Sequence, residues 1–160
     1  MAQCVGGKDS YPDETGESNS DDYGLDNASI SSSATSFKSE ADVTSDTAII
    51  KSPKIDSCYK QLAVSELGGL PAGATLNSAV IDVTSGSAGG PKNVVATATG
   101  KIEVTASGQV LDFYLNIAFI TGPSIEAEVD FFNIGSSVPA ALRSSLIAKV
   151  AARAVAAAQA

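Results

Sequence analysis

The chain of 160 residues contains no histidine and no tryptophan, and it has only two cysteines. Histidine is the side chain whose ordinary pKa lies nearest to neutrality, and it is the commonest metal ligand in proteins. Its absence removes most of the familiar hydrolase, transferase and zinc mechanisms, which depend on an imidazole. An enzyme made from this chain would rely on aspartate, glutamate, lysine or tyrosine, so we predict that the protein is not an enzyme and uses no cofactor or metal.

Positive charge is also scarce, since ten lysines and arginines stand against 18 aspartates and glutamates, for a net charge of −8. The imbalance lies in residues 1–50, which carry ten acids and two lysines, whereas residues 51–160 carry eight of each sign. Without a basic stripe the chain cannot neutralise phosphates, and anionic lipid headgroups would repel it. We therefore expect no nucleic-acid partner.

Long apolar runs are missing as well, because no stretch reaches the 18 apolar residues typical of a transmembrane helix. The first residues show neither the charged n-region nor the apolar h-region of a signal peptide. One interpretation is a cytoplasmic protein. We favour a chain that starts after its targeting segment and works outside the cytoplasm, because a folded domain seldom begins with a cysteine and a long polar stretch.

The length predicts one domain with a substantial core. Residues 1–33 are rich in Ser, Asp, Glu, Gly and Asn and poor in large apolar residues, which predicts an acidic flexible segment. We expect a single α+β domain over residues 34–160. Short strands or a helical turn are predicted within 34–51, and the apolar spacing over 55–67 predicts an amphipathic helix.

Four runs in the second half of the sequence predict β-strands, because each is apolar or alternating and turn-forming residues lie between them. They cover residues 76–84, 94–105, 110–121 and 125–131. We expect them to form an antiparallel meander with one apolar face.

The third run is the clearest of the four, since large apolar side chains occupy every second position from Leu111 to Phe119. Asp112, Tyr114 and Asn116 alternate with them and therefore project from the opposite side of the strand. We take these three as candidate ligand-binding residues, for a cleft on the partly covered second face of the sheet.

In the fourth run, apolar residues alternate with Glu126, Glu128 and Asp130. Such alternation is typical of a strand with one solvent-facing side. The three carboxylates are therefore expected to face solvent, and not to act as paired acid and base groups.

Residues after Pro139 predict a C-terminal helix, with Leu142, Leu146, Val150 and Ala154 at four-residue spacing. We expect this helix to cover the apolar face of the sheet. The predicted fold is therefore α+β, with an antiparallel meander of about four to five strands packed against the C-terminal helix and a second helix near residues 55–67.

Acidic residues of the N-terminal segment offer oxygen atoms but lack the Asp-x-Asp-x-Asp-Gly register of a calcium loop, so we expect no metal site there. They are Asp13, Glu14, Glu17, Asp21, Asp22 and Asp26.

The run FITGPSIEAEVDFFNIGSSVPAALRSSLIAKVAAR, with a cysteine in the predicted helix upstream of it, resembles the extracytoplasmic sensor-like domains of actinobacterial lipoproteins and receptor serine/threonine kinases. The matching positions are Gly122, the segment Gly135 to Pro139, and Ala151 to Arg153. They are turn and packing signals, and the resemblance extends over about residues 34–155. It implies a sheet-and-helix fold similar to that of PsbP-like proteins, an exported location and a disulfide.

Cys4 and Cys58 have three interpretations. We favour a disulfide, on the even number of cysteines, the acidic chain between them and the resemblance; closing that loop would contribute about 4 kcal/mol in the chain-entropy model. Alternatively, Cys4 is a lipidated N-terminus, or both cysteines are free and Cys58 belongs to the core.

Together these features predict a non-catalytic exported domain, sensor-like and actinobacterial, that binds an unknown small molecule, lipid or envelope protein. The alternative is a structural or assembly module that docks on another envelope protein.

Overall fold

The computed structural model describes residues 14–25, 27–59, 61, 73–86 and 90–157. A short helix covers residues 55–59. The other elements are β1 (Glu14–Asn19), β2 (Tyr23–Leu25), β3 (Ala28–Phe37), α2 (Glu40–Ile50), β4 (Thr75–Ser85), β5 (Val94–Ala106), β6 (Gln109–Thr121), β7 (Ile125–Ile134) and α4 (Ala140–Ala157).

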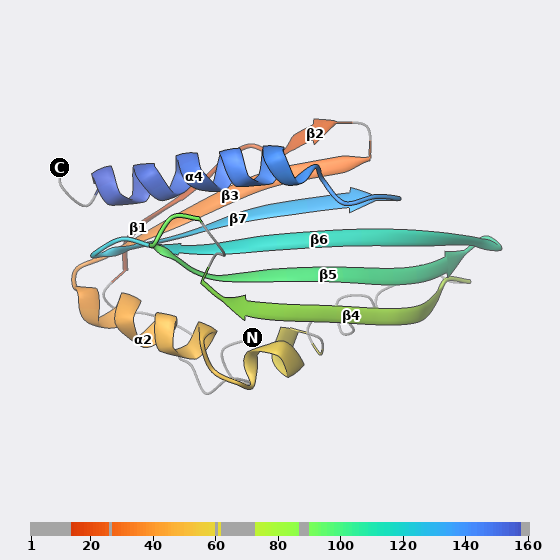
Figure 1. Cartoon of the computed structure of the whole chain (residues 1–160), viewed down its shortest axis with the longest axis horizontal. Helices are drawn as coiled ribbons and strands as arrows, with labels where there is room; N and C mark the ends of the chain where they lie inside the picture. The colour runs from red at the N-terminus through yellow and green to blue at the C-terminus, as the bar shows by residue number, and fades with distance from the viewer. Residues whose placement is uncertain (1–13, 26, 60, 62–72, 87–89, 158–160) are drawn as a thin grey trace.

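The fold is α+β, as predicted, and is built on one antiparallel sheet. The strand order is β1-β3-β7-β6-β5-β4, and β2 also pairs with β3, which makes seven strands (Figure 1). Strands β4 to β7 form the predicted meander. The sheet is larger than the four to five strands expected, because the N-terminal part of the chain adds β3 beside β7, and β1 and β2 beside β3.

The prediction that residues 1–33 form a flexible loop is wrong for the part that the structure describes. β3 pairs with β7 from Ala28↔Asn133 to Ser36↔Ile125, so it also crosses the expected domain boundary at residue 34. Backbone hydrogen bonds form this ladder whatever the side chains are, and Ile30 packs against the core beneath α4. Residues 1–13 lie outside the described residues.

Residues 34–51 contain the end of β3 and the helix α2. The helix predicted over 55–67 is observed at residues 55–59 and 61, and its remaining residues lie outside the described part of the chain.

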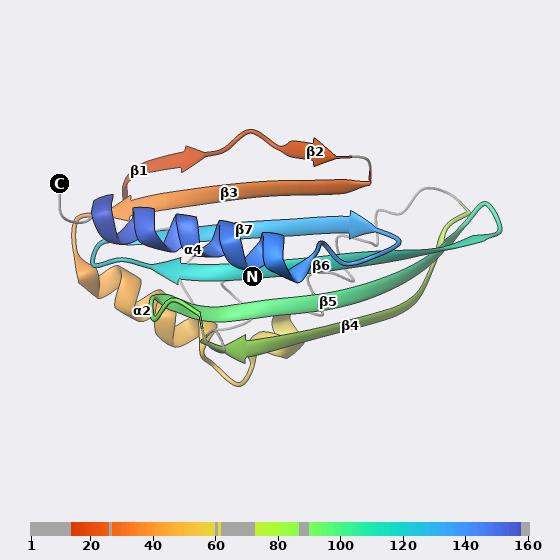
Figure 2. The same ribbon diagram turned by 45° about the horizontal axis from the view of Figure 1, so that its top comes forward.

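The two faces of the sheet carry different helices (Figures 1 and 2). α4 packs on one face, where Leu146, Ile147, Val150, Ala151 and Ala154 contact a core built mainly on β7. On the opposite face, α2 and the short helix contribute Ile50, Ile55 and Tyr59 to a second core with β4, β5 and β6.

Contacts in the C-terminal half of α4 fix the position of this helix on the sheet. The Asn93 Nδ2 donates hydrogen bonds to the carbonyl oxygens of Ala151 (3.0 Å) and Thr121 (3.2 Å). A Cβ at Gly122 would lie only 2.8 Å from the carbonyl oxygen of Ala154, so this position needs glycine for the close approach of the helix. The helix therefore cannot slide along the sheet without breaking these contacts.

The expectation that the C-terminal helix covers the Leu111 to Phe119 side of β6 is wrong. Asn116 faces α4, together with its partner Phe131 on β7, whereas Ile117 and Phe119 belong to the core on the α2 side. The reason is that β7 buries Phe131 under α4, and residues paired across an antiparallel ladder share a face of the sheet. The predicted single apolar face is in fact two partly buried faces.

Among the described residues, no helix is both long enough and apolar enough to cross a membrane.

Candidate functional site

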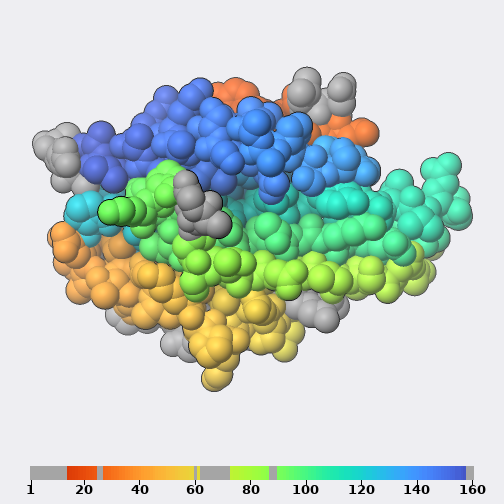
Figure 3. Space-filling model, viewed as in Figure 1, coloured from red at the N-terminus to blue at the C-terminus, as the bar shows by residue number. Residues whose placement is uncertain are grey.

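Two adjoining cavities lie beside α4, on the flank that faces β5 and β6. Their volumes are about 210 and 370 Å³, and both are lined by Thr99, Asn116 and Arg143. Figure 3 shows this side of the molecule, where α4 (blue) lies above the green surface of β5 and β4. Because they share three residues, we treat the two cavities as one groove and call it the α4 groove.

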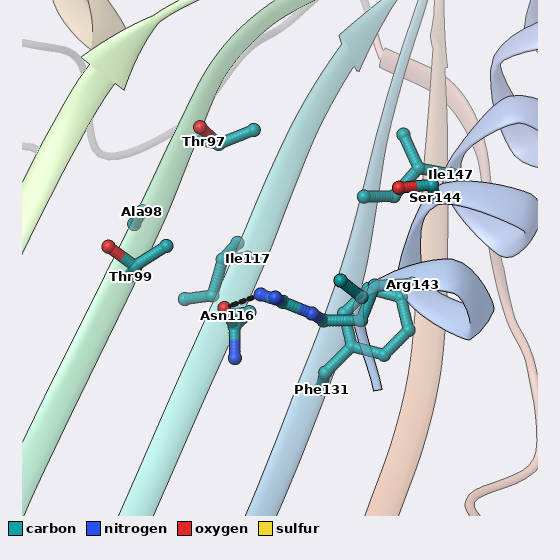
Figure 4. Close-up of a pocket in the computed structure, with 10 residues that line it drawn as sticks. Thr97, Ala98, Thr99, Asn116, Ile117, Phe131, Arg143, Ser144 and Ile147 are labelled. Carbon is teal, nitrogen blue, oxygen red and sulfur yellow. Dashed lines mark hydrogen bonds between the residues drawn. The ribbon is translucent and has the colours of Figure 1, made fainter. Parts of the chain in front are cut away.

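The centre of the α4 groove is an arginine that crosses from the helix to the sheet (Figure 4). Arg143 lies in the first turn of α4, and its backbone N–H donates to the Pro139 carbonyl oxygen at 3.1 Å. Its side chain passes beside Phe131 of β7, and its Nη1 donates a hydrogen bond to the Oδ1 of Asn116 on β6. The Nε of Arg143 is buried and has no hydrogen-bond partner. The guanidinium is therefore only partly satisfied.

Polar side chains of β4 and β5 form the floor of the α4 groove next to Asn116. The register places Asp82, Thr99 and Asn116 in one row across β4, β5 and β6. Adjacent strands lie about 4.8 Å apart, so the row spans about 10 Å. Thr97 lies on the same face of β5, and Ser144 of α4 lines the opposite wall. The walls thus offer hydroxyl groups on two sides of the guanidinium.

One ion pair lies at the far end of this face among the described residues. The Nζ of Lys101 lies 2.9 Å from the Oδ2 of Asp112, and the hydrogen bond that it donates to this carboxylate raises the pKa of Lys101. The ammonium also lies 5.8 Å from the centre of the Tyr114 ring. Lys101 and Tyr114 line the larger cavity, so the charge of Lys101 is already compensated where a ligand would meet it.

The three residues that the alternation singled out have separate positions in this arrangement. Asn116 and Tyr114 line the α4 groove, whereas Asp112 does not line it and binds Lys101 instead. That any of them binds a ligand stays a prediction. Arg143 was missed, although its position four residues before Ile147 and eight before Ala151 puts it on the buried side of α4.

The expectation that Glu126, Glu128 and Asp130 lie on a solvent-facing side is wrong, because all three are half-buried on the α2 face of the sheet. Their register partners on β6 include Phe119 and Ile117, which belong to the core on that face. The carboxylates are enclosed because the helices that cover these apolar residues also cover them.

Burial and neighbouring acids raise the pKa of these groups. Burial, with Asp46 and Asp42 of α2 close by, raises the pKa of Glu126 to about 8. Burial and the adjacent Asp130 raise the pKa of Glu128 to about 8 as well. The pKa of Asp130 is raised by burial, and a hydrogen bond with Glu128 opposes that rise. Glu126 and Glu128 therefore hold protons near neutral pH.

Tyr59 borders the same carboxylates, and burial followed by the charges of Glu128 and Asp130 raises its pKa. A phenol that stays protonated is a poor base. Neither cavity of the α4 groove is lined by any of these groups, so they do not meet a ligand that binds there.

No metal centre is found within the described part of the chain, where no cluster of three or more Asp, Glu, Cys or His side chains has an arrangement that would hold an ion. Cys58 is buried, with 2% of its surface exposed, and is not a free thiol. Cys4 lies outside the described residues, so the Cys4–Cys58 disulfide stays a prediction.

A further cavity of about 330 Å³ lies on the other flank of α4, above β1 and β3. Serines of both strands line it, together with Arg153. It lacks a partner for that arginine comparable to Asn116, so we place the candidate site in the α4 groove.

No protein-family model matches this chain, and no curated protein matches it. The resemblance to actinobacterial sensor-like domains therefore depends on the sequence motifs alone and stays a prediction.

Proposed function

We propose that this domain is a non-catalytic, exported, sensor-like domain that binds a small molecule in the α4 groove. The observation that carries the proposal is the pair formed by Arg143 and Asn116. The pair brings a charged and an amide side chain from α4 and β6 to the wall of a cavity between helix and sheet. Concave sites with a few convergent polar groups are the usual form of small-molecule sites.

The side chains around Arg143 in the smaller cavity support binding without chemistry. Thr97, Thr99 and Ser144 supply hydroxyl groups to the smaller cavity, whose described lining holds no carboxylate or lysine that would activate one, and Asp82 lines only the larger cavity. The carboxylic acids with raised pKa lie on the other face of the sheet, beneath α2. The exported location and the sensor role are supported by the sequence resemblance and the expected disulfide.

Native mass spectrometry of the chain, exported to an oxidising compartment, tests the proposal. We expect a non-covalent adduct that disappears when the same sample is denatured. In the variant Ser144→Phe the new ring would fill the α4 groove, and the adduct should be lost. Ser145→Phe is the matched control, because Ser145 is exposed on the same helix and lines neither cavity of the groove.

Two results would count against the proposal. One is an adduct that survives Ser144→Phe unchanged, which would place the ligand elsewhere. The other is the bare mass under both conditions, which favours the alternative of a structural module that docks on another envelope protein. The side chain of Val110, which is 61% accessible and lines neither cavity of the groove, would then be the first position to test for a partner.

A further inference from the structure

Arg143 forms no ion pair with a described residue of the α4 groove, where the one carboxylate, Asp82, lies two strands away from Asn116. The hydrogen-bond partner of Arg143, Asn116, is neutral, and the other cation of the groove, Lys101, is held by Asp112. A guanidinium remains charged at all physiological pH values. A charge that is removed from water without an opposite charge is unfavourable. The groove therefore favours an anion beside Arg143.

The shape of the donor group narrows the class of anion. A guanidinium presents parallel N–H groups that match the two oxygens of a carboxylate. The Nη1 of Arg143 is taken by Asn116, whereas the Nε has no partner. The Nε is enclosed by protein atoms, so the guanidinium has to rotate before this edge can meet a ligand. The positive end of α4, which begins at Ala140 on the cavity wall, adds a favourable field.

The surrounding charges favour a single negative charge. Asp82 lines the same groove from β4, and the chain as a whole carries a net charge of −8. A dianion such as phosphate would meet one cation without an ion pair and a nearby carboxylate. A monoanion would be neutralised by Arg143 alone.

The remaining wall groups indicate the rest of the ligand. Thr97, Thr99 and Ser144 offer hydroxyl groups that both donate and accept hydrogen bonds. Phe131 and Ile147 supply an apolar side. The smaller of the two cavities, which Phe131 and Ser144 line, holds about 210 Å³, less than the roughly 300 Å³ at which the usual site of a drug-sized ligand begins. The space suits a small organic acid.

We infer that the α4 groove binds a small monocarboxylate that carries hydroxyl groups, with its carboxylate on the guanidinium of Arg143. This inference rests on the proposed function, since it names the ligand class of the same site.

The test is a titration of the ¹⁵N-labelled whole chain, followed by NMR at constant ionic strength, with sodium lactate and sodium gluconate as probes. We expect saturable shifts of the Arg143 Nε–H and of the Asn116 side-chain amide. Binding should be weakened about tenfold or more with lactamide, the neutral analogue, and with inorganic phosphate, because each changes the charge that Arg143 meets. Because these ligands are compared on the wild-type chain, no substitution can disturb folding and obscure the result.

Arg143→Gln should weaken lactate or gluconate binding by about tenfold or more, as expected when a charge-assisted hydrogen bond is lost. Lys149→Gln is the matched control, because it removes a cation from the exposed side of the same helix and should leave binding unchanged.

The outcomes separate this inference from the proposed function. Equal affinity for lactamide and lactate, or a native adduct that is lost in Ser144→Phe and is not an acid, overturns the monocarboxylate and leaves ligand binding standing. Phosphate binding tighter than either probe also overturns it. If no probe shifts the groove residues and the native sample carries no adduct, both proposals fail.

Discussion

The two faces of the sheet bury polar residues of very different kinds. On the α4 face, Asn116 lies beside Phe131 and meets the guanidinium of Arg143 next to a cavity. On the α2 face, Glu128 lies beside Phe119 and meets other acids beneath the helices. The first arrangement leaves space and a cation without an ion pair, whereas the acids of the second line neither cavity of the α4 groove.

The contrast shows how register distributes polar groups. β6 and β7 each alternate apolar and polar residues, but the pairing sets the polar side of one strand beside the apolar side of the other. Covering either face with a helix therefore encloses polar groups of the neighbouring strand. The side chains of the covering helix determine the environment of these enclosed polar groups. α4 contributes an arginine to one face, and α2 contributes Asp42 and Asp46 to the other.

Truncation of the α4-face core should have the largest effect. Phe131 is 1% exposed, and Phe131→Ala should lower the free energy of unfolding by about 3–5 kcal/mol. Phe132→Ala is the matched control on the other face, where the side chain is 40% exposed and lies 5.6 Å from the Phe113 ring. We expect it to cost about 1 kcal/mol. Urea unfolding measures both, and equal losses would mean that the α4 face does not dominate the core.

The α2 face should depend on the predicted disulfide. Cys58 lies in the short helix that covers this face, and loss of the bond should lower the free energy of unfolding by about 4 kcal/mol. Cys4→Ser and Cys58→Ser should then have similar effects, and reduction should add two hydrogens to the intact mass. If only Cys58→Ser is destabilising, Cys58 is a core residue and the predicted pairing is wrong.

The acids of the α2 face should make stability depend on pH. The folded pKa of Glu126 and of Glu128 is raised to about 8 from an ordinary value of 4.5. Below pH 4.5 both the folded and the unfolded chain keep these protons. Between pH 4.5 and 8 the unfolded chain releases protons that the folded chain retains, so the free energy of unfolding falls as the pH rises. The slope is about 1.4 kcal/mol per pH unit for the proton of Glu128 and smaller for that of Glu126, which solvent partly screens.

Glu128→Gln should flatten that slope and stabilise the protein at pH 8, because the amide needs no proton to remain neutral. Asp21→Asn removes one acid from an exposed position and serves as the control, with the slope expected to stay as in the wild type. Urea unfolding from pH 4.5 to 8 measures the three proteins. A wild-type stability that rises over this interval would show that the buried acids are already compensated.

The strands of the meander and the C-terminal helix could be predicted from the sequence, because alternation and four-residue spacing are patterns within one segment of chain. β3 could not be predicted in this way, since its serine-rich composition resembles a loop and its partner β7 lies about 100 residues away. Only part of the candidate site could be predicted from the sequence. Alternation separates Asn116 and Tyr114 from the apolar side of β6, but only the register and the seat of α4 bring Arg143 to Asn116.

Replacement of the groove arginine should have the smallest effect on stability. Arg143→Met loses the hydrogen bond to Asn116 and also removes a partly buried charge that has no ion pair, and these changes oppose each other. We expect the free energy of unfolding in the absence of ligand to change by less than about 1 kcal/mol. Urea unfolding beside Lys149→Met, an exposed position on α4, checks this. A loss of unfolding free energy as large as that of Phe131→Ala would show that Arg143 holds α4 on the sheet. Its role would then be structural, and the α4 face would no longer differ from the α2 face as a binding face.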